Sequence, residues 1–184
     1  MARKKGSSRK TGRRASIGMT RLFSRLPMTV VFLFVLAWAG ATYFLQGKVV
    51  SVIDGDSLMV QVSFTEKLEV RLYGIDCPES KQRGGDAAAQ KTRSLALFSP
   101  VKLEVMDTDQ YGRKVAIVTL EDGSVLNEEL LWDGQAWLYS PYCKDRRCKD
   151  WKILENAARE DRRGLWADKS PTPPWKWRQQ NNRQ

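Results

Sequence analysis

The sequence contains no histidine, and this absence excludes several classes of hydrolase. Imidazole is the usual general base, nucleophile or metal ligand near neutral pH. Ser-His-Asp hydrolysis, Cys-His chemistry and His-ligated zinc sites are therefore excluded by composition alone. Cysteine is also scarce, with three residues in the chain. Any catalysis must depend on carboxylates, arginines and a cation bound by oxygen ligands.

Acidic residues are absent from the first 25 positions, which contain nine Lys or Arg. The formal net charge is +10, but the other 22 basic residues nearly balance the 21 acidic ones. The high net charge is thus a property of the N-terminal segment and says little about the substrate. We expect residues 1–26 to form a basic, disordered segment in the cytoplasm.

An uncharged apolar run from Met28 to Leu45 follows the basic segment. It is slightly shorter than the roughly 20 residues of a full membrane span. Because the basic flank lies on its N-terminal side, the chain that follows is expected across the membrane, in the periplasm or outside the cell. We expect residues 27–46 to be a transmembrane anchor. The alternative is a signal peptide cleaved near Ala41, which would release a secreted protein.

From Gly47 onward the pattern is that of short β-strands with an Asp54-Gly55 hairpin turn. The sequence predicts an α+β fold: a five-stranded barrel with three helices over residues 47–168. The expected strands are 48–53, 56–64, 68–75, 101–106 and 113–120. The expected helices begin at caps Asp86 and Asn127 and near Lys149, the last ending before Gly164. Residues 169–184 are expected to be a polar, irregular tail whose two tryptophans can fold back onto the barrel.

Two aspartates at strand ends predict a cation site. Asp56 follows the hairpin turn, and Asp76 ends the third strand, where Pro78 forces the chain out of the sheet. The backbone carbonyl of Cys77 offers a third oxygen, and such hard ligands suit calcium. Because Arg71 and Asp76 have opposite strand parity, bringing both to one site requires a bulge or strand end near Gly74.

Three further residues supply what phosphodiester hydrolysis requires. Arg71 precedes the expected cation site, Glu79 follows it, and Arg113 follows the turn Asp-Gln-Tyr-Gly. Guanidinium groups bind phosphate oxygens in bidentate fashion, and a carboxylate can orient or deprotonate an attacking water. We therefore predict Arg71, Glu79 and Arg113 as the catalytic residues.

Five motifs in order, VIDGDS, RLYGIDCPES, DQYGR, VLNEELLWDGQAW and AREDRRGLW, resemble the staphylococcal nuclease family across nearly all of residues 47–168. The resemblance implies an OB-fold barrel and calcium-dependent cleavage of DNA and RNA, single-stranded or denatured, to 3′-phosphate ends. It assigns calcium to Asp56, Asp76 and the Cys77 carbonyl. It also implies that Tyr111, and less securely Tyr139 and Tyr142, contact the bound nucleotide.

Several alternatives remain open at this point. An OB-type barrel can bind single-stranded nucleic acid or a protein without cutting it. An inactive barrel serving as a membrane scaffold would show no effect of calcium. Cys143 and Cys148 are expected to form a disulfide in an exported domain, against the alternative of two free thiols.

Overall fold

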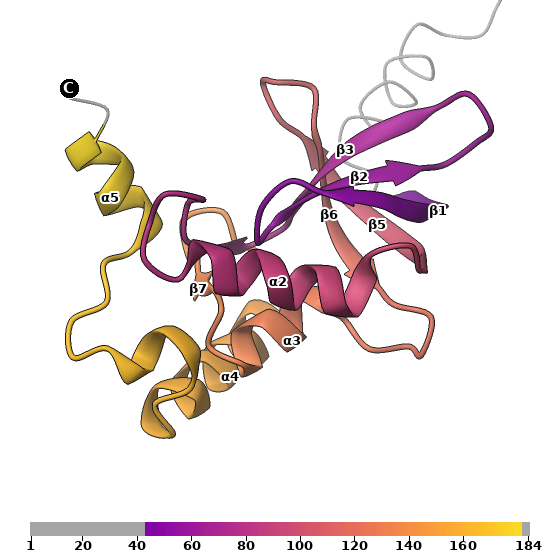
Figure 1. Cartoon of the computed structure of the whole chain (residues 1–184). Helices are drawn as coiled ribbons and strands as arrows, with labels where there is room; N and C mark the ends of the chain where they lie inside the picture. Colours follow the sequence, from indigo (N-terminus) through magenta and orange to yellow (C-terminus); the bar gives the residue numbers. More distant parts are fainter. Residues whose placement is uncertain (1–42, 182–184) are drawn as a thin grey trace, which may run out of the picture. The chain divides into compact units, whose positions relative to one another are not determined.

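Five strands of the computed structural model, which describes residues 43–181, close into a barrel (Figure 1). Their order is β1-β2-β3-β6-β5, and β1 pairs with both β2 and β5. The β3–β6 pair is parallel and the other pairs are antiparallel. The expected five-stranded barrel is thus confirmed; the strands are β1 (Tyr43–Val52), β2 (Ser57–Gln61), β3 (Lys67–Leu72), β5 (Pro100–Thr108) and β6 (Lys114–Thr119).

The interior of the barrel is filled by aliphatic side chains from alternate strand positions. In β5 the buried residues are Val101, Leu103 and Val105, whereas the residues between them are exposed or half-buried. This alternation arises because successive side chains of a strand point to opposite faces of the sheet. Val49, Leu58, Val60, Val70 and Val118 from the other strands are completely buried in the same core.

The first strand begins earlier than the sequence pattern indicates. Tyr43 pairs with Val105 and Gln46 with Lys102, so residues 43–46 belong to β1 and not to the apolar segment assigned to the membrane. The remainder of that segment, residues 27–42, lies outside the described residues, as does the basic segment before it. Among residues 43–181, none of the helices has the length and apolar character needed to cross a membrane.

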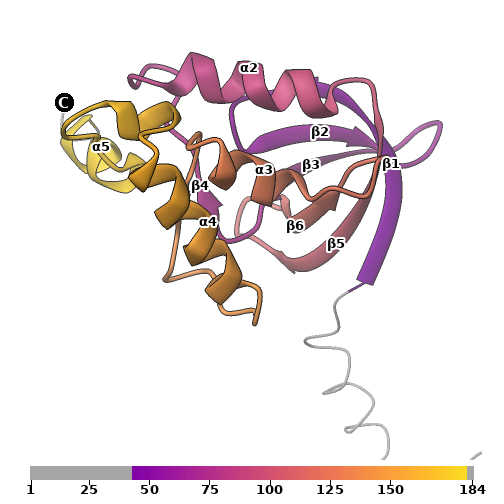
Figure 2. The same ribbon diagram turned by 90° about the horizontal axis from the view of Figure 1, so that it is seen from below.

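Within residues 43–181, four α-helices accompany the barrel: α2 (Gly85–Ala96), α3 (Leu126–Trp132), α4 (Cys148–Glu160) and α5 (Pro174–Asn181). Figure 2 shows α2 along one side of the barrel, with α3 beside it and α4 packed on α3. A 3₁₀ helix, η1 (Gly164–Ala167), follows α4. The three expected helices are confirmed, but the tail expected to be irregular contains α5.

The helix ends differ from the expected caps. Gly84, with φ of +92°, precedes α2. Asp86 lies in the first turn, where its negative charge interacts favourably with the helix dipole. Asn127 is also not a cap but a buried residue of α3. α4 ends at Glu160, four residues before Gly164, which instead begins η1.

Four tryptophans associated with the helices and with β7 divide into two groups. Trp137, Trp151 and Trp166 are buried. Trp132 is 47% exposed, and its ring is covered by the guanidinium of Arg163 at 3.7 Å. This cation–π contact explains how an exposed ring is accommodated at the end of α3.

Candidate active site

The turn between β1 and β2 places Asp56 at one end of the barrel. The amide of Asp56 donates to Asp54 Oδ1 at 3.0 Å, and the hydroxyl of Thr92 in α2 donates to the Gly55 carbonyl at 2.6 Å. A side chain at position 55 would meet Cys77 Cβ at 2.6 Å and Ala88 Cβ at 2.8 Å. Only glycine fits this turn, which therefore packs tightly against both α2 and the segment that follows Asp76.

A break after β3 brings Arg71 and Asp76 to the same side. β3 ends at Leu72, and a two-residue strand, β4 (Ile75–Asp76), begins after Gly74, whose φ is +70°. β4 pairs with β7 (Trp137–Leu138) instead of continuing in the barrel. The expected strand end near Gly74 is therefore confirmed, but Asp76 ends β4 and not the third strand, which was expected to run to residue 75.

Asn127 holds this break in place from the adjacent helix. Its side-chain amide donates to the Tyr73 carbonyl at 3.0 Å, and its oxygen accepts the Val118 amide proton at 3.1 Å. Both backbone groups are thereby satisfied inside the core, where an unpaired polar group is costly. The sequence pattern predicts a helix cap at Asn127, because a polar residue before an apolar run is typical of one, and this prediction is wrong.

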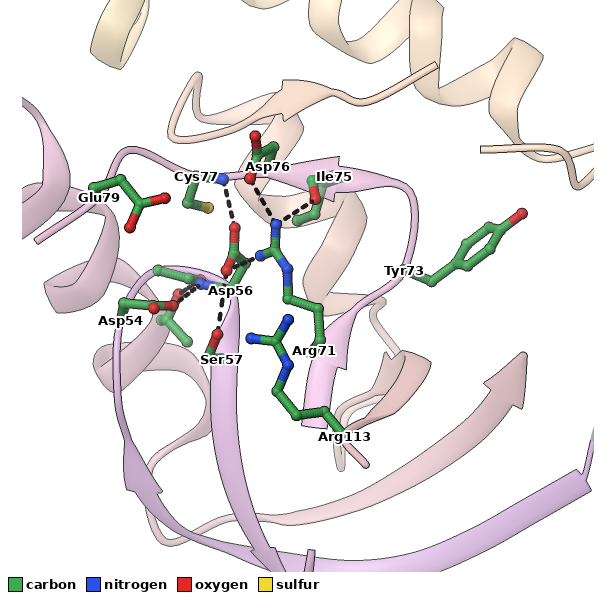
Figure 3. Close-up of polar contacts among 12 residues, drawn as sticks. Asp54, Asp56, Ser57, Arg71, Tyr73, Ile75, Asp76, Cys77, Glu79 and Arg113 are labelled. Atoms are coloured by element: carbon green, nitrogen blue, oxygen red, sulfur yellow. Dashed lines mark hydrogen bonds and ion pairs between the residues drawn. The ribbon is translucent and has the colours of Figure 1, made fainter. Parts of the chain in front are cut away.

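Arg71 joins the two aspartates at the centre of the site (Figure 3). Its Nη2 donates to Asp76 Oδ1 at 2.6 Å and to the Ile75 carbonyl at 3.3 Å, and its Nη1 forms an ion pair with Asp56 Oδ1. The other oxygen of Asp56 accepts the backbone amide of Cys77 at 2.5 Å. Asp56 is 5% exposed and Asp76 1% exposed, so hydrogen bonds and ion pairs to these partners replace the water that would otherwise stabilise the two charges.

Arg113 enters the same cavity from the β5–β6 turn. Its Nε donates to Asp109 Oδ2 at 2.7 Å, and Figure 3 shows its guanidinium extending toward the carboxylates that Arg71 contacts. Burial raises the pKa of Asp109, but hydrogen bonds from Arg113 and Tyr111 outweigh it and hold that pKa below the ordinary value. Asp109 therefore stays ionised and fixes the direction of Arg113.

All three expected catalytic residues and both aspartates line one cavity of about 720 Å³. The three tyrosines expected at the nucleotide also line it. Tyr139 and Tyr142 are stacked with ring centroids 5.1 Å apart, whereas Tyr111 is 76% exposed at the tip of the β5–β6 turn. The cavity thus combines cationic, anionic and aromatic groups in a volume that accommodates a nucleotide.

The C-terminal helix adds a residue to the site that the sequence pattern did not indicate. From α5, Arg178 Nη2 donates to Asp76 Oδ2 at 2.8 Å, and Nη1 donates to Glu79 Oε1 at 2.5 Å. Burial lowers the pKa of Arg178, but these two hydrogen bonds raise it above the ordinary arginine value. The only local signal for α5 is Pro174, which lies at the first helical position, where proline is favoured.

The donor groups around Asp56 and Asp76 are chemically suited to calcium. Within the described residues, no cluster of three or more His, Cys, Asp and Glu side chains is arranged to hold a metal ion. Two carboxylates and the backbone carbonyl of Cys77 nevertheless form an all-oxygen set, which is what calcium accepts when water completes its shell. The Cys77 thiol is not a cation ligand, because burial raises its pKa well above the ordinary value, despite the opposing effect of Arg71, and keeps it protonated.

The two cysteines after β7 are joined. Cys143 and Cys148 form a disulfide, with Cα atoms 5.8 Å apart, that closes the turn before α4. Cys77 is the free cysteine of the chain and is buried. The disulfide lies beside Gly74, where an added Cβ would meet Cys143 Sγ at 2.7 Å, so it also packs against the strand break.

Comparisons with known proteins agree with this geometry. Residues 69–168 match the family described as staphylococcal nuclease homologues. An uncharacterized endonuclease of Escherichia coli O157:H7 is 36% identical over 146 residues, 79% of this chain and 93% of that protein. A micrococcal nuclease of Shigella flexneri is 34% identical over 157 residues, 81% of this chain and 87% of that protein. A staphylococcal-like nuclease CAN1 of Arabidopsis thaliana is 38% identical over 113 residues, 61% of this chain and 34% of that protein. The chain belongs to the staphylococcal nuclease family.

Proposed function

We propose that this nuclease hydrolyses phosphodiester bonds of DNA and RNA in a calcium-dependent reaction that leaves 3′-phosphate ends. The observation that supports it best is the convergence of Arg71, Arg113, Glu79 and the two aspartates on one cavity. These residues come from four separate segments of the chain, and fold stability alone does not require so many charges at one end of the barrel. Buried charges gathered in a cleft are typical of catalytic sites.

Calcium would be held by Asp56, Asp76 and the carbonyl of Cys77. When bound, it supplies positive charge that neutralises the phosphodiester and makes an attacking water more acidic. The protein contributes rigidity to this site, because Asp56 is fixed by the Cys77 amide and both aspartates are fixed by Arg71. A site organised in advance loses little energy to reorganisation during the reaction.

Glu79 is the residue that would orient and deprotonate the water. The water oxygen forms a bond to phosphorus, its proton passes to Glu79, and the bond from phosphorus to the 5′-oxygen breaks. The leaving 5′-oxygen takes a proton from solvent, so the products carry a 3′-phosphate and a 5′-hydroxyl. Arg71 and Arg113 contact the phosphate oxygens, whose negative charge grows as the five-coordinate state forms. Arginine suits this role because it stays protonated at all relevant pH values.

The aromatic residues favour a single-stranded or denatured substrate. Tyr111, Tyr139 and Tyr142 line the cavity beside the charged groups. A base can stack on such a ring only after it leaves its own stack in a duplex, so unpaired strands bind at lower cost. Stacking contacts the base and not the 2′-hydroxyl, so it is compatible with both DNA and RNA.

The test is cleavage of denatured DNA and RNA by the full chain, with calcium or with chelator. We expect Glu79→Ser and Arg113→Ala to lose at least about a hundredfold in kcat, the size of effect that follows removal of one group that stabilises the transition state. Glu66→Ser, which changes an exposed acid in the β2–β3 hairpin outside the cavity, is the matched control. Nucleic-acid binding without cleavage in the wild type would reject the enzyme and favour a binding module.

We further propose that the domain functions outside the cytoplasm, either tethered through the apolar segment that precedes β1, residues 27–42, or released after cleavage near Ala41. The orientation is supported by the charge difference across this segment: nine Lys or Arg precede it, whereas Lys48 is the one basic residue between positions 43 and 60. Protease added to intact spheroplasts should then digest the domain. Protection of the domain in intact spheroplasts, with digestion only after lysis, would reject this location.

A further inference from the structure

Helix α5 contributes one residue to the lining of the active-site cavity. The residue that reaches the site is Arg178, which lines the cavity together with Arg71 and Arg113. Its guanidinium contacts both oxygens of Asp76, Oδ2 at 2.8 Å and Oδ1 at 3.3 Å, as well as Glu79. Arg178 therefore occupies the two carboxylates that cation binding and water activation would use.

The position of α5 does not depend on Arg178 alone. Trp175 stacks on Tyr139 with ring centroids 5.1 Å apart, and Tyr139 stacks in turn on Tyr142. Before the helix, the Thr172 carbonyl accepts a hydrogen bond at 2.6 Å from the buried side chain of Gln82. Because these contacts hold the start of α5, Arg178 can change partners by side-chain rotation while the helix stays at the site.

The net charge of the site indicates when Arg178 would exchange its carboxylate partners for a phosphate. Three carboxylates, those of Asp56, Asp76 and Glu79, are in direct contact with two guanidinium groups, those of Arg71 and Arg178. A divalent cation would turn this excess of one negative charge into an excess of one positive charge. One phosphodiester group restores neutrality, and the planar fork of arginine matches its oxygens.

We propose that Arg178 is a third phosphate-binding arginine of this site, held on Asp76 and Glu79 until the cation displaces it. The proposal rests on the proposed function, because it assigns the calcium ligands and the substrate given there. Arg178 competes with the cation for Asp76 in the absence of nucleic acid. Once displaced, it binds a phosphate of the substrate strand and releases Glu79 toward the water. The cation and Arg178 thus exclude one another at Asp76, whereas the substrate and Arg178 stabilise one another.

The first experiment measures calcium binding by titration calorimetry without nucleic acid. Arg178→Ala should bind calcium roughly fivefold more tightly than the wild type or better, because a competing cation has been removed. Lys176→Ala is the matched control: it removes one positive charge from an exposed position of the same helix and should leave the affinity unchanged. Calcium affinity that is equal or weaker in Arg178→Ala would overturn the proposal.

The second experiment measures substrate binding with calcium in excess. The probe is a fluorescein-labelled single-stranded oligonucleotide with phosphorothioate linkages, which resist cleavage, and the readout is fluorescence anisotropy. Arg178→Ala should weaken binding roughly tenfold, the effect of losing one charged bidentate contact. Arg178→Lys, which keeps the charge but not the fork, should give an intermediate value, and Lys176→Ala should bind as the wild type does.

Unchanged oligonucleotide binding in Arg178→Ala, with calcium affinity raised, would make Arg178 a competitor only and overturn its role with phosphate. Failure of the proposed function is distinct from this result. A wild type that binds calcium and the oligonucleotide but cuts nothing would reject the nuclease mechanism, while the two affinities of Arg178→Ala would still decide the role of Arg178. A wild type that binds neither calcium nor the oligonucleotide would reject both.

Discussion

Asn127 offers the sharpest test of how the fold positions the site. It is completely buried, and its side chain satisfies the Tyr73 carbonyl and the Val118 amide at the strand break that separates Arg71 from Asp76. Asn127→Ala leaves two buried backbone groups without partners, each at a cost of about 1–2 kcal/mol. The variant should therefore lose roughly 2–4 kcal/mol of unfolding free energy, which corresponds to a fall in Tm of roughly 8–16 °C for a domain of this size.

The assay is urea unfolding followed by tryptophan fluorescence, together with cleavage activity at a temperature where the variant stays folded. Activity should also fall, because the break that brings Arg71 and Asp76 together loses its support. Glu121→Ala, which changes an exposed residue of the loop before α3, is the control and should stay within about 0.5 kcal/mol of the wild type. A loss below about 1 kcal/mol in Asn127→Ala would refute the reasoning, since even one unsatisfied buried group costs that much.

Three further predictions concern pH, redox state and cation. A hydrogen bond from Arg147 is the main cause that lowers the pKa of Glu104 from its ordinary value near 4.5. The ion pair therefore contributes its full stability at pH values above 4.5, and this contribution is lost as the pH falls through the lowered pKa of Glu104. The wild type should be more stable than Glu104→Gln at pH 7 by at most about 1 kcal/mol, because the pair is partly exposed. Urea unfolding should show this difference shrinking as the pH is lowered from 7 to 3, and a constant difference would contradict the assignment. Reduction of the Cys143–Cys148 disulfide, which closes a short loop, should cost about 2 kcal/mol in the wild type and nothing in the Cys143→Ser, Cys148→Ser double variant. Calcium at about a hundred times its Kd should raise the free energy of unfolding by about 2.7 kcal/mol, and chelator should reverse this; an unchanged Tm would reject a calcium site.

The sequence allowed the barrel strands and most of the site to be predicted because their signals are local. Alternating apolar residues and the Asp54-Gly55 turn defined the strands, and opposite strand parity was enough to predict the end near Gly74. The start of β1 was missed because residues 43–46 are uncharged and continue an apolar run, so no change of pattern marks the boundary. Their pairing with β5 depends on residues more than 50 positions away.

The contributions of Asn127 and Arg178 were missed for a different reason. Asn127 lies in a sequence context that is also typical of a helix cap, and only its bond to Tyr73, 54 residues away, identifies its role. Arg178 reaches Asp76 across 102 residues from a tail that is polar, carries three prolines between positions 171 and 174, and has no amphipathic pattern. Contacts of this range depend on how whole elements pack, which residue spacing does not encode.

The burial of Cys77 also limits which cysteines can form a disulfide as the chain folds. Its thiol lies against Gly55, and burial raises its pKa. Disulfide exchange requires attack by a thiolate on an accessible sulfur, so a protonated, enclosed thiol is inert toward the other two cysteines. Once the barrel has closed, Cys143 and Cys148 are left as the one reactive pair. In an oxidising compartment the chain can therefore reach its single correct pairing without an isomerase, provided that packing of the barrel precedes oxidation.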